Sequence, residues 1–373
     1  MKLFKSLLVA PATLGLLAPM AATANEVTIS DFTPAEELAI TNSRVDGLEA
    51  RMNNIEAGSF SETTTASFSA DMAIGAVDGG TATTDDAVEA YYGFQIDLNT
   101  SFTGEDSLDI SLDAGNAGGA VTEFDLNGTT NEALTVDGVS YTFPLGDATV
   151  FVGDNTDGSA LFSTACVYGG PSNTLDDCGN VSANFAGGGT AAGASVDFEN
   201  GFTAAVGYAG TGSSTSGLLT EEGLDSYGVN VAYTGDNYGV SATYAMSETD
   251  EAGGYEEDNF TALNAYYTPE SFPVSLSFGY EWGVDGSAAA TADETTSYFI
   301  GVQFDEVGPG TLGTAFGTKT PTVEETEDLL MYEVFYSYPI NDGMTITPLA
   351  YIKEFSGTTD DETGVMVKTS FSF

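Results

Sequence analysis

The sequence contains no histidine, and only 7 of its 373 residues are Lys or Arg. The absence of histidine removes the usual general base, the Ser-His and Cys-His nucleophile pairs and the commonest zinc ligand. The 56 Asp and Glu residues give a formal net charge of -49, which makes nucleic acid an unsuitable partner. We therefore predict neither an enzyme, nor a metal or cofactor site, nor a nucleic-acid-binding protein.

Basic residues are missing from the whole stretch between Met52 and Thr318. Acidic residues there have no Lys or Arg nearby in the chain, so mobile cations or a salty medium must screen them. The acid clusters at 323–328 and 358–364 lack the ligand spacing of an EF-hand. We interpret them as solvated loops, with weak calcium binding as the alternative.

The chain has only two cysteines, Cys166 and Cys178. In an exported protein such a pair most simply forms a disulfide that closes a short loop. Two free thiols are the alternative.

Long apolar runs are also missing: no stretch after the N-terminus approaches the roughly 20 residues of a membrane-spanning helix. The N-terminal "MKLFKSLLVAPATLGLLAPMAATA" combines Lys2 and Lys5 with an apolar stretch and a small-residue site at Ala22 to Ala24, which predicts a signal peptide over residues 1–24. Export follows. Without a spanning helix, a membrane-embedded chain of this kind is predicted to be a β-barrel.

Residues 25–58 contain a short heptad pattern, which predicts a periplasmic helix. It covers about three heptads, too few for a stable isolated coiled coil, so we expect it to form where other contacts already join copies of the chain. A helix that lies against or plugs its own barrel is the alternative. The seam consists of Leu38, Thr41, Val45, Leu48, Met52 and Ile55.

Residues 60–373 alternate between apolar and polar side chains. In "FPVSLSFGYEWG", Val274 to Trp282 place apolar residues at every second position, with Ser275, Ser277 and Glu281 between them. Tight turns such as "TGEDS" and "PINDG" alternate with longer acidic stretches such as "MSETDEAGGYEED" and "GTKTPTVEETED". This pattern predicts an all-β membrane protein, an antiparallel transmembrane barrel of about 16 strands. The alternation is least regular near residues 134, 148 and 190.

The C-terminal run from Val365 to Phe373 is predicted to be the last strand, pairing with the first near Thr63 and closing the barrel. Aromatic residues near strand ends predict girdles at the lipid boundary, with ordinary β-propensity as the alternative. They are Tyr91, Tyr141, Phe143, Tyr208, Tyr233, Tyr238, Tyr267, Phe272, Tyr338 and Phe373.

A barrel of this width leaves an aqueous channel, and its inward-facing positions set selectivity. By alternation the predicted pore-lining residues are Gln95, Asp97, Asn99, Asp109, Ser111, Asp113, Asp197, Glu281, Glu333, Tyr351, Lys353 and Lys368. Carboxylates predominate, which favours cations. The two lysines either face carboxylates across the pore or anchor near a rim. The region from Cys166 to Gly189 is the candidate constriction loop.

Four separated blocks resemble a known family: the signal segment, "RVDGLEARMNNIEAGSFSETTTASF", "IDLNTSFTGEDSLDISLDAGN" and "SYTFPLGD". Together they are similar to cyanobacterial outer-membrane porins related to carbohydrate-selective porins. The resemblance implies a homotrimeric 16-stranded barrel in the outer membrane that passes small solutes. Such porins typically carry an S-layer-homology domain before the coiled coil. Only "NEVTISDFTPAEELAITN" stands there, so wall anchoring is not expected.

The sequence therefore predicts a porin in the outer membrane of a Gram-negative-type, cyanobacterial cell. Its partners are outer-membrane lipid, two further copies of the chain, small hydrophilic solutes and inorganic ions, with a bias toward cations. The sequence leaves passage of sugars open. The alternative is a structural or adhesive barrel with a plugged pore.

Overall fold

The computed structural model describes residues 64–80, 87–124, 126, 131–185, 189–212, 217–220, 224–251, 254–285, 293–323, 326–357 and 359–373. The predicted signal peptide and the heptad seam lie outside the described residues and stay predictions. Within the described residues, no helix is long and apolar enough to cross a membrane.

The described residues form 17 β-strands, all in one sheet. The first nine are β1 (Thr64–Asp78), β2 (Glu89–Thr100), β3 (Ser107–Gly115), β4 (Thr135–Leu145), β5 (Ala148–Asp154), β6 (Thr190–Asp197), β7 (Phe202–Gly210), β8 (Ser226–Thr234) and β9 (Tyr238–Glu251). The others are β10 (Gly254–Tyr267), β11 (Val274–Asp285), β12 (Asp293–Val307), β13 (Gly310–Thr318), β14 (Thr322–Val323), β15 (Leu330–Asn341), β16 (Met344–Lys353) and β17 (Glu362–Ser372).

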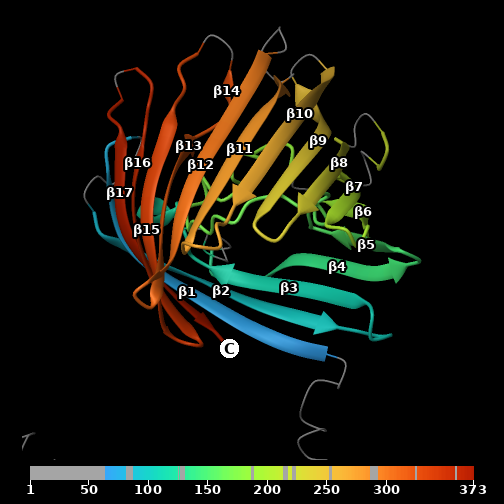
Figure 1. The fold of residues 1–373 in the computed structure, drawn as a ribbon, viewed down its shortest axis with the longest axis horizontal. Helices are drawn as coiled ribbons and strands as arrows, with labels where there is room; N and C mark the ends of the chain where they lie inside the picture. The colour runs from blue at the N-terminus through green and yellow to red at the C-terminus, as the bar shows by residue number, and fades with distance from the viewer. Residues whose placement is uncertain are drawn as a thin grey trace, which may run out of the picture. The chain divides into compact units, whose positions relative to one another are not determined.

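The sheet closes on itself (Figure 1). β17 pairs with β1, and the Phe68 N–H donates to Phe373 O at 2.9 Å while the Phe373 N–H donates to Phe68 O at 3.0 Å. The two-residue β14 pairs only with β12, and β13 pairs directly with β15. Setting β14 aside, 16 strands make up the wall. The predicted fold is confirmed, including strands at the three irregular stretches.

The two ends of the barrel differ. Tight turns join β2 to β3, β4 to β5, β6 to β7, β8 to β9, β10 to β11, β12 to β13 and β15 to β16. We call this the short-turn end. The connections from β1 to β2, β3 to β4 and β5 to β6 leave from the opposite, long-loop end.

One acidic stretch differs from its prediction as a loop. β9 runs on to Glu251 and β10 begins at Gly254, so most of "MSETDEAGGYEED" belongs to a long hairpin. Backbone pairing needs no apolar face. A hairpin that extends beyond an apolar environment can therefore continue with polar side chains on both faces, where alternation no longer marks it as a strand.

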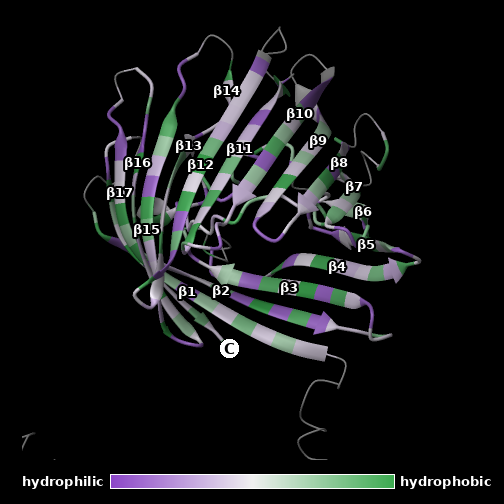
Figure 2. Cartoon of the chain, in the orientation of Figure 1, coloured by the Kyte–Doolittle hydropathy of each residue, from purple (hydrophilic) through white to green (hydrophobic). Residues whose placement is uncertain are grey.

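The outer face of the wall is apolar. Along β11, Trp282 is 40 % exposed on this face, whereas its neighbour Glu281 points inward and is 2 % exposed. Figure 2 shows the same alternation of hydrophobic and hydrophilic positions along several strands. A closed wall with an apolar outside is the arrangement that suits contact with lipid.

Aromatic side chains on the outer face gather near both ends of the strands. Tyr141 and Phe143 stack with ring centroids 5.4 Å apart at the short-turn end, and Tyr280 and Trp282 lie 5.8 Å apart toward the long-loop end. Tyr91 does not join them, so its assignment to a girdle was wrong. It lies opposite Ala73 on the inner face, because its parity along β2 turns it inward although it is close to the strand end.

Candidate functional site

The inner face of the wall is traced by register, because residues directly opposite each other in paired strands point to the same side. All of the predicted pore-lining residues occupy inner-face positions: Gln95, Asp97, Asn99, Asp109, Ser111, Asp113, Asp197, Glu281, Glu333, Tyr351, Lys353 and Lys368. Their role in lining a channel stays a prediction. What distinguishes them is whether another part of the chain covers them.

Residues 155–185, between β5 and β6, lie against the inner face, and we call them the first inner segment. Alternate backbone N–H groups of this segment donate to side-chain oxygens on β8, β9, β11 and β12. The bonds are Ser163 N–H to Asn230 Oδ1 at 3.0 Å, Ala165 to Ser241 Oγ at 2.9 Å, Val167 to Ser277 Oγ at 3.1 Å and Gly169 to Gln303 Oε1 at 3.0 Å. Side chains of the wall thus hold this part of the first inner segment in an extended conformation.

The first inner segment then turns back. Its two legs are joined by the Cys166–Cys178 disulfide, with Cα atoms 6.4 Å apart, which confirms the predicted pairing. On the returning leg, the N–H groups of Ser182 and Ala183 donate to Glu281 Oε2 at 2.9 and 2.8 Å. Residues 166–185 of the predicted constriction region therefore lie inside the barrel, held by the disulfide and by the wall.

Three predicted pore-lining residues are covered by this arrangement. Glu281, Glu333 and Tyr351 are each only 2 to 3 % exposed. Glu281 accepts hydrogen bonds from backbone N–H groups of the first inner segment, and Glu333 accepts a hydrogen bond from the Tyr168 hydroxyl at 2.5 Å. These side chains are contacts between the wall and the inner segments and do not form open channel surface.

Residues 116–124, between β3 and β4, form a second inner segment. Its Glu123 carboxylate makes an ion pair with Lys353 of β16, and the Lys368 ammonium lies 5.3 Å from the centroid of the Phe124 ring. The two lysines thus hold this segment in place. For Lys353, which lies at the long-loop end of β16, the geometry favours the predicted rim anchor over a charge that faces carboxylates across the lumen.

The two inner segments meet inside the barrel. The Asn173 N–H donates to Glu123 O at 2.8 Å, and Phe124 forms an isolated β-bridge with Ser172. Beneath the contact, an apolar cluster packs against the wall; it includes Val121, Phe124, Tyr168, Leu175, Phe299 and Phe335. The side chains of this cluster fix the position of both segments by burial rather than by hydrogen bonds alone.

An acidic part of the inner wall, Asp97, Asp109 and Asp113, lies on β2 and β3; we call it the acidic wall. Neutral donors hold each carboxylate: Gln95 Nε2 and Ser111 Oγ bond Asp97 Oδ1 at 2.6 and 2.7 Å, Asn99 Nδ2 bonds Asp109 Oδ1 at 2.6 Å, and Thr135 Oγ1 bonds Asp113 Oδ1 at 2.8 Å. Among the described residues, the Glu123–Lys353 contact is the one ion pair. No cation of the described chain therefore pairs with the acidic wall.

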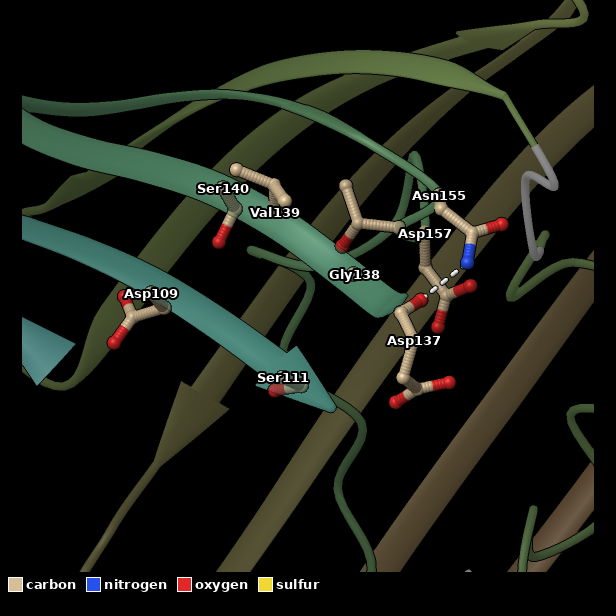
Figure 3. Close-up of a pocket in the computed structure, with 9 residues that line it drawn as sticks. Asp109, Ser111, Asp137, Gly138, Val139, Ser140, Asn155 and Asp157 are labelled. Atoms are coloured by element: carbon tan, nitrogen blue, oxygen red, sulfur yellow. Dashed lines mark hydrogen bonds between the residues drawn. The ribbon is translucent and has the colours of Figure 1, made fainter. Parts of the chain in front are cut away.

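A polar cavity of about 280 Å³ adjoins the acidic wall (Figure 3). Asp109 of β3 and Asp137 of β4 line it together with Asp157 of the first inner segment. Burial raises the pKa of Asp177, on the same segment, and the negative charge of Asp157 raises it further. The carboxylates that line the cavity thus belong both to the wall, through Asp109 and Asp137, and to the first inner segment, through Asp157. In the described part of the chain, no group of three or more Asp, Glu, Cys or His side chains is arranged to hold a metal ion.

Several of these groups were not singled out from the sequence. Glu123, Asp137 and Asp157 lie in or beside the connections after β3 and β5, where strand alternation gives no information about direction. The length of the connection between β3 and β4, with its "NAGGA" start, was the available signal that this stretch folds as a unit of its own.

Comparison with known proteins supports the fold. No protein-family model matches the chain. An uncharacterized protein of Nostoc sp. is 26 % identical over 381 residues, which cover 84 % of this chain and 65 % of the relative. This chain therefore spans less than two thirds of that relative's length.

Several solved porins share the barrel. An anion-selective porin from Comamonas acidovorans superposes with a TM-score of 0.63 at 14 % identity, covering 83 % of this chain and 99 % of the porin. OprB of Pseudomonas putida gives 0.62 at 10 % identity, covering 83 % and 94 %. A porin variant of Rh. blastica gives 0.57 at 13 % identity, covering 83 % and 100 %. At these identities the likeness concerns the fold.

Proposed function

We propose that this chain is an outer-membrane porin that passes small hydrophilic solutes and inorganic ions by passive diffusion, with a preference for cations. The porin-like barrel, the apolar outer face and the aromatic residues near both ends of the strands support residence in the outer membrane of a Gram-negative-type cell. The Nostoc relative supports a cyanobacterial source.

The observation that carries the cation preference is the acidic wall. Among the described residues, only neutral groups donate hydrogen bonds to its carboxylates. Their negative charges are therefore not compensated by a neighbouring cation of the chain and act on the ions in the channel. At a separation of about 6 Å and an effective dielectric constant of about 20, one carboxylate attracts a monovalent cation by roughly 3 kcal/mol. Because the Debye length is about 10 Å at 0.1 M salt, this preference weakens as salt rises.

We propose a homotrimer as the working assembly. Apolar side chains on the outer face of β1 and β17 offer a surface for a second copy: Met72 is 58 % exposed, Ile74 51 % and Val365 61 %. The predicted heptad helix within residues 25–58 would add a second contact between copies. Native mass spectrometry of the detergent-solubilised protein tests the stoichiometry.

The second candidate, a structural or adhesive barrel with a plugged pore, is favoured by one specific observation. The two inner segments meet through Asn173, Glu123 and Phe124 and so span part of the lumen. Conductance separates the candidates, because a plugged barrel produces no stable current steps.

The test is single-channel recording in a planar bilayer under a KCl gradient. We expect stable steps and a reversal potential of the sign that cation passage produces. Neutralising the acidic wall with Asp97→Asn, Asp109→Asn and Asp113→Asn should move the reversal potential toward zero. Asp147→Asn, in the short turn between β4 and β5, is the matched control and should leave it unchanged. Absence of steps from folded trimers would reject the porin and favour the plugged barrel.

Sugar passage is a separate part of the proposal and rests on the family resemblance of the opening sequence blocks. Proteoliposomes swell when an uncharged solute enters through a pore. Swelling in isosmotic sugar that exceeds swelling in a larger neutral polymer would support sugar passage, and equal exclusion of both would reject it.

A further inference from the structure

The inner face is covered around most of the barrel. On every wall strand from β5 round to β17, and on β1, at least one inner-face side chain is no more than 5 % exposed. Phe151 of β5 is 2 % exposed, Glu281 of β11 is 2 % and Ala73 of β1 is 3 %. The two inner segments and two apolar clusters pack against these strands and fill the lumen beside them.

Three neighbouring strands, β2, β3 and β4, differ from the rest of the wall. Apart from glycines, all of their residues are half-buried or exposed. On their inner face, Asn99 near the short-turn end and Thr135 near the long-loop end are both exposed. We call the inner face of these three strands the open strip, because it is uncovered along the height of the wall.

The polar cavity of about 280 Å³ lies between the open strip and the start of the first inner segment (Figure 3). Asp109 of β3 and Ser140 of β4 line it from the wall, and Thr156 and Asp157 line it from the segment. Among the described residues that line it, Val139 has the one apolar side chain. Such a surface suits water and hydrated ions.

The backbone on both sides of Asp157 is fixed to the wall. The Asn155 N–H donates to Gly189 O at 2.9 Å, and Asn155 Nδ2 donates to the backbone carbonyl of Asp137 on β4. The Gly158 carbonyl packs so closely on Gly207 of β7 that a Cβ at Gly207 would overlap it. Asp157, which is exposed, is therefore held between two anchored neighbours and faces the cavity.

We propose that this cavity is the narrow part of the permeation path, and that Asp157 is a specificity-determining residue there. The inference rests on the proposed porin function and adds the side of the lumen on which solutes cross. A solute beside the open strip meets carboxylates from the wall and from the first inner segment. Fixed charges on both sides of a narrow passage raise the local concentration of cations.

The basic residues of the barrel lie elsewhere. Lys353 and Lys368 belong to β16 and β17, and Lys319 directly follows β13. Lys353 pairs with Glu123, and the Lys368 ammonium lies beside the Phe124 ring. The contribution of Asp157 to selectivity therefore does not depend on a surplus of charge around the lysines.

The first test compares two serines of the inner face. Ser140→Cys places a thiol in the cavity, and Ser297→Cys, on β12, is the matched control because Ser297 is 0 % exposed. The native cysteines are paired with each other, so the introduced thiol is the one that reacts. A cationic methanethiosulfonate reagent should modify Ser140→Cys in the folded full chain and cause a stepwise loss of single-channel conductance. It should leave Ser297→Cys unmodified, as measured by mass spectrometry.

The outcomes separate this inference from the porin function. Unchanged conductance after complete modification of Ser140→Cys would overturn the proposed path while the porin function stands. Equally rapid modification of folded Ser297→Cys would show that the other side of the lumen is open, which also overturns it. Absence of current steps from the wild-type protein would reject the porin function and this inference with it.

The second test concerns Asp157 while the acidic wall stays intact. In Asp157→Asn the cation-to-anion permeability ratio, obtained from the reversal potential, should fall about two- to tenfold. Asp157→Glu keeps the charge and should keep the ratio. Asp236→Asn, which removes an exposed carboxylate from the short turn between β8 and β9, is the control and should leave it unchanged. A wild-type ratio in Asp157→Asn would overturn the role of Asp157.

Discussion

Lys353 of β16 and Glu123 of the second inner segment form an ion pair across 230 positions of the sequence. The side chains are 16 % and 5 % exposed, so the pair is largely withdrawn from water. Removing one partner leaves the other charge buried without compensation.

Replacing Lys353 with Met should therefore destabilise the barrel by about 3 to 5 kcal/mol. The free energy of unfolding in urea, measured in lipid vesicles, checks this value. Glu123→Gln should cost less, since the flexible Lys353 side chain that it leaves unpaired lies at the long-loop end of β16 and can turn toward water. If Lys353→Met and Glu123→Gln add without coupling in a double-mutant cycle, the ion pair has no energetic role.

Loss of the disulfide should loosen the first inner segment. Cys166 and Cys178 join the outgoing and returning legs, which are otherwise held by hydrogen bonds to the wall and by the buried apolar cluster. Cys166→Ala with Cys178→Ala should lower stability by about 2 to 4 kcal/mol. In bilayer recordings we also expect larger current fluctuations within the open state. Wild-type protein treated with a reductant should behave in the same way. If current fluctuations do not increase in either case, the disulfide does not restrain the first inner segment.

A methyl group at Gly279 should displace the returning leg. A Cβ built at this position overlaps Cys178 O, whereas one built at Gly118 meets no atom within 4 Å. Gly279→Ala should therefore cost about 1 to 3 kcal/mol through overpacking. Gly118→Ala is the control and should change stability little. Equal melting temperatures for the two variants would show that the returning leg does not pack on β11 in solution.

The turn between β2 and β3 should respond to acid through Asp106. A hydrogen bond from the Tyr141 hydroxyl, at 2.7 Å, is the main cause that lowers the pKa of this carboxyl; bonds from Thr103 and Ser101 also lower it, against the opposing effect of burial. A lowered pKa in the folded state contributes stability above the unfolded pKa of about 3.9, and this contribution is lost as pH falls through the folded pKa.

Asp106→Asn should therefore be less stable than the wild type at neutral pH, and the difference should shrink below about pH 4. Melting curves recorded from pH 7 down to pH 2 measure it. Asp147→Asn, in the next short turn, serves as the control and should show no such pattern. A difference that stays constant with pH would exclude the titration of Asp106 as its cause.

Most of the fold could be predicted from the alternation of apolar and polar residues along the strands. In β11 the positions from Val274 to Trp282 separate an apolar from a polar face, and the structure places the apolar face of this strand on the outside of the wall. The pairing of the terminal strand with β1 also followed from alternation and from the cost of an open edge. Tyr91 shows the limit of this reasoning, since its place near a strand end suggested the lipid boundary while its parity turned it inward.

The candidate site depended on information that local patterns do not contain. Asp97 and Glu281 are both acidic residues on the inner face, but Asp97 is partly open whereas backbone N–H groups of the first inner segment cover Glu281. The contact between Gly169 and Gln303 spans 134 positions, and no periodicity relates such distant residues. Asp137 and Asp157 adjoin the same cavity only because the connection after β5 folds back into the barrel.

By itself, the sequence determined the β-class, a wall of about 16 strands and the side of the wall that the alternating residues face, since alternation is a local property of an extended backbone. It also excluded histidine chemistry and made the wall acidic. Tertiary structure alone decided which inner-face residues are covered, where Lys353 finds its partner and how the two inner segments meet. These outcomes depend on burial and hydrogen bonding between residues far apart in the chain, which only the closed barrel brings together.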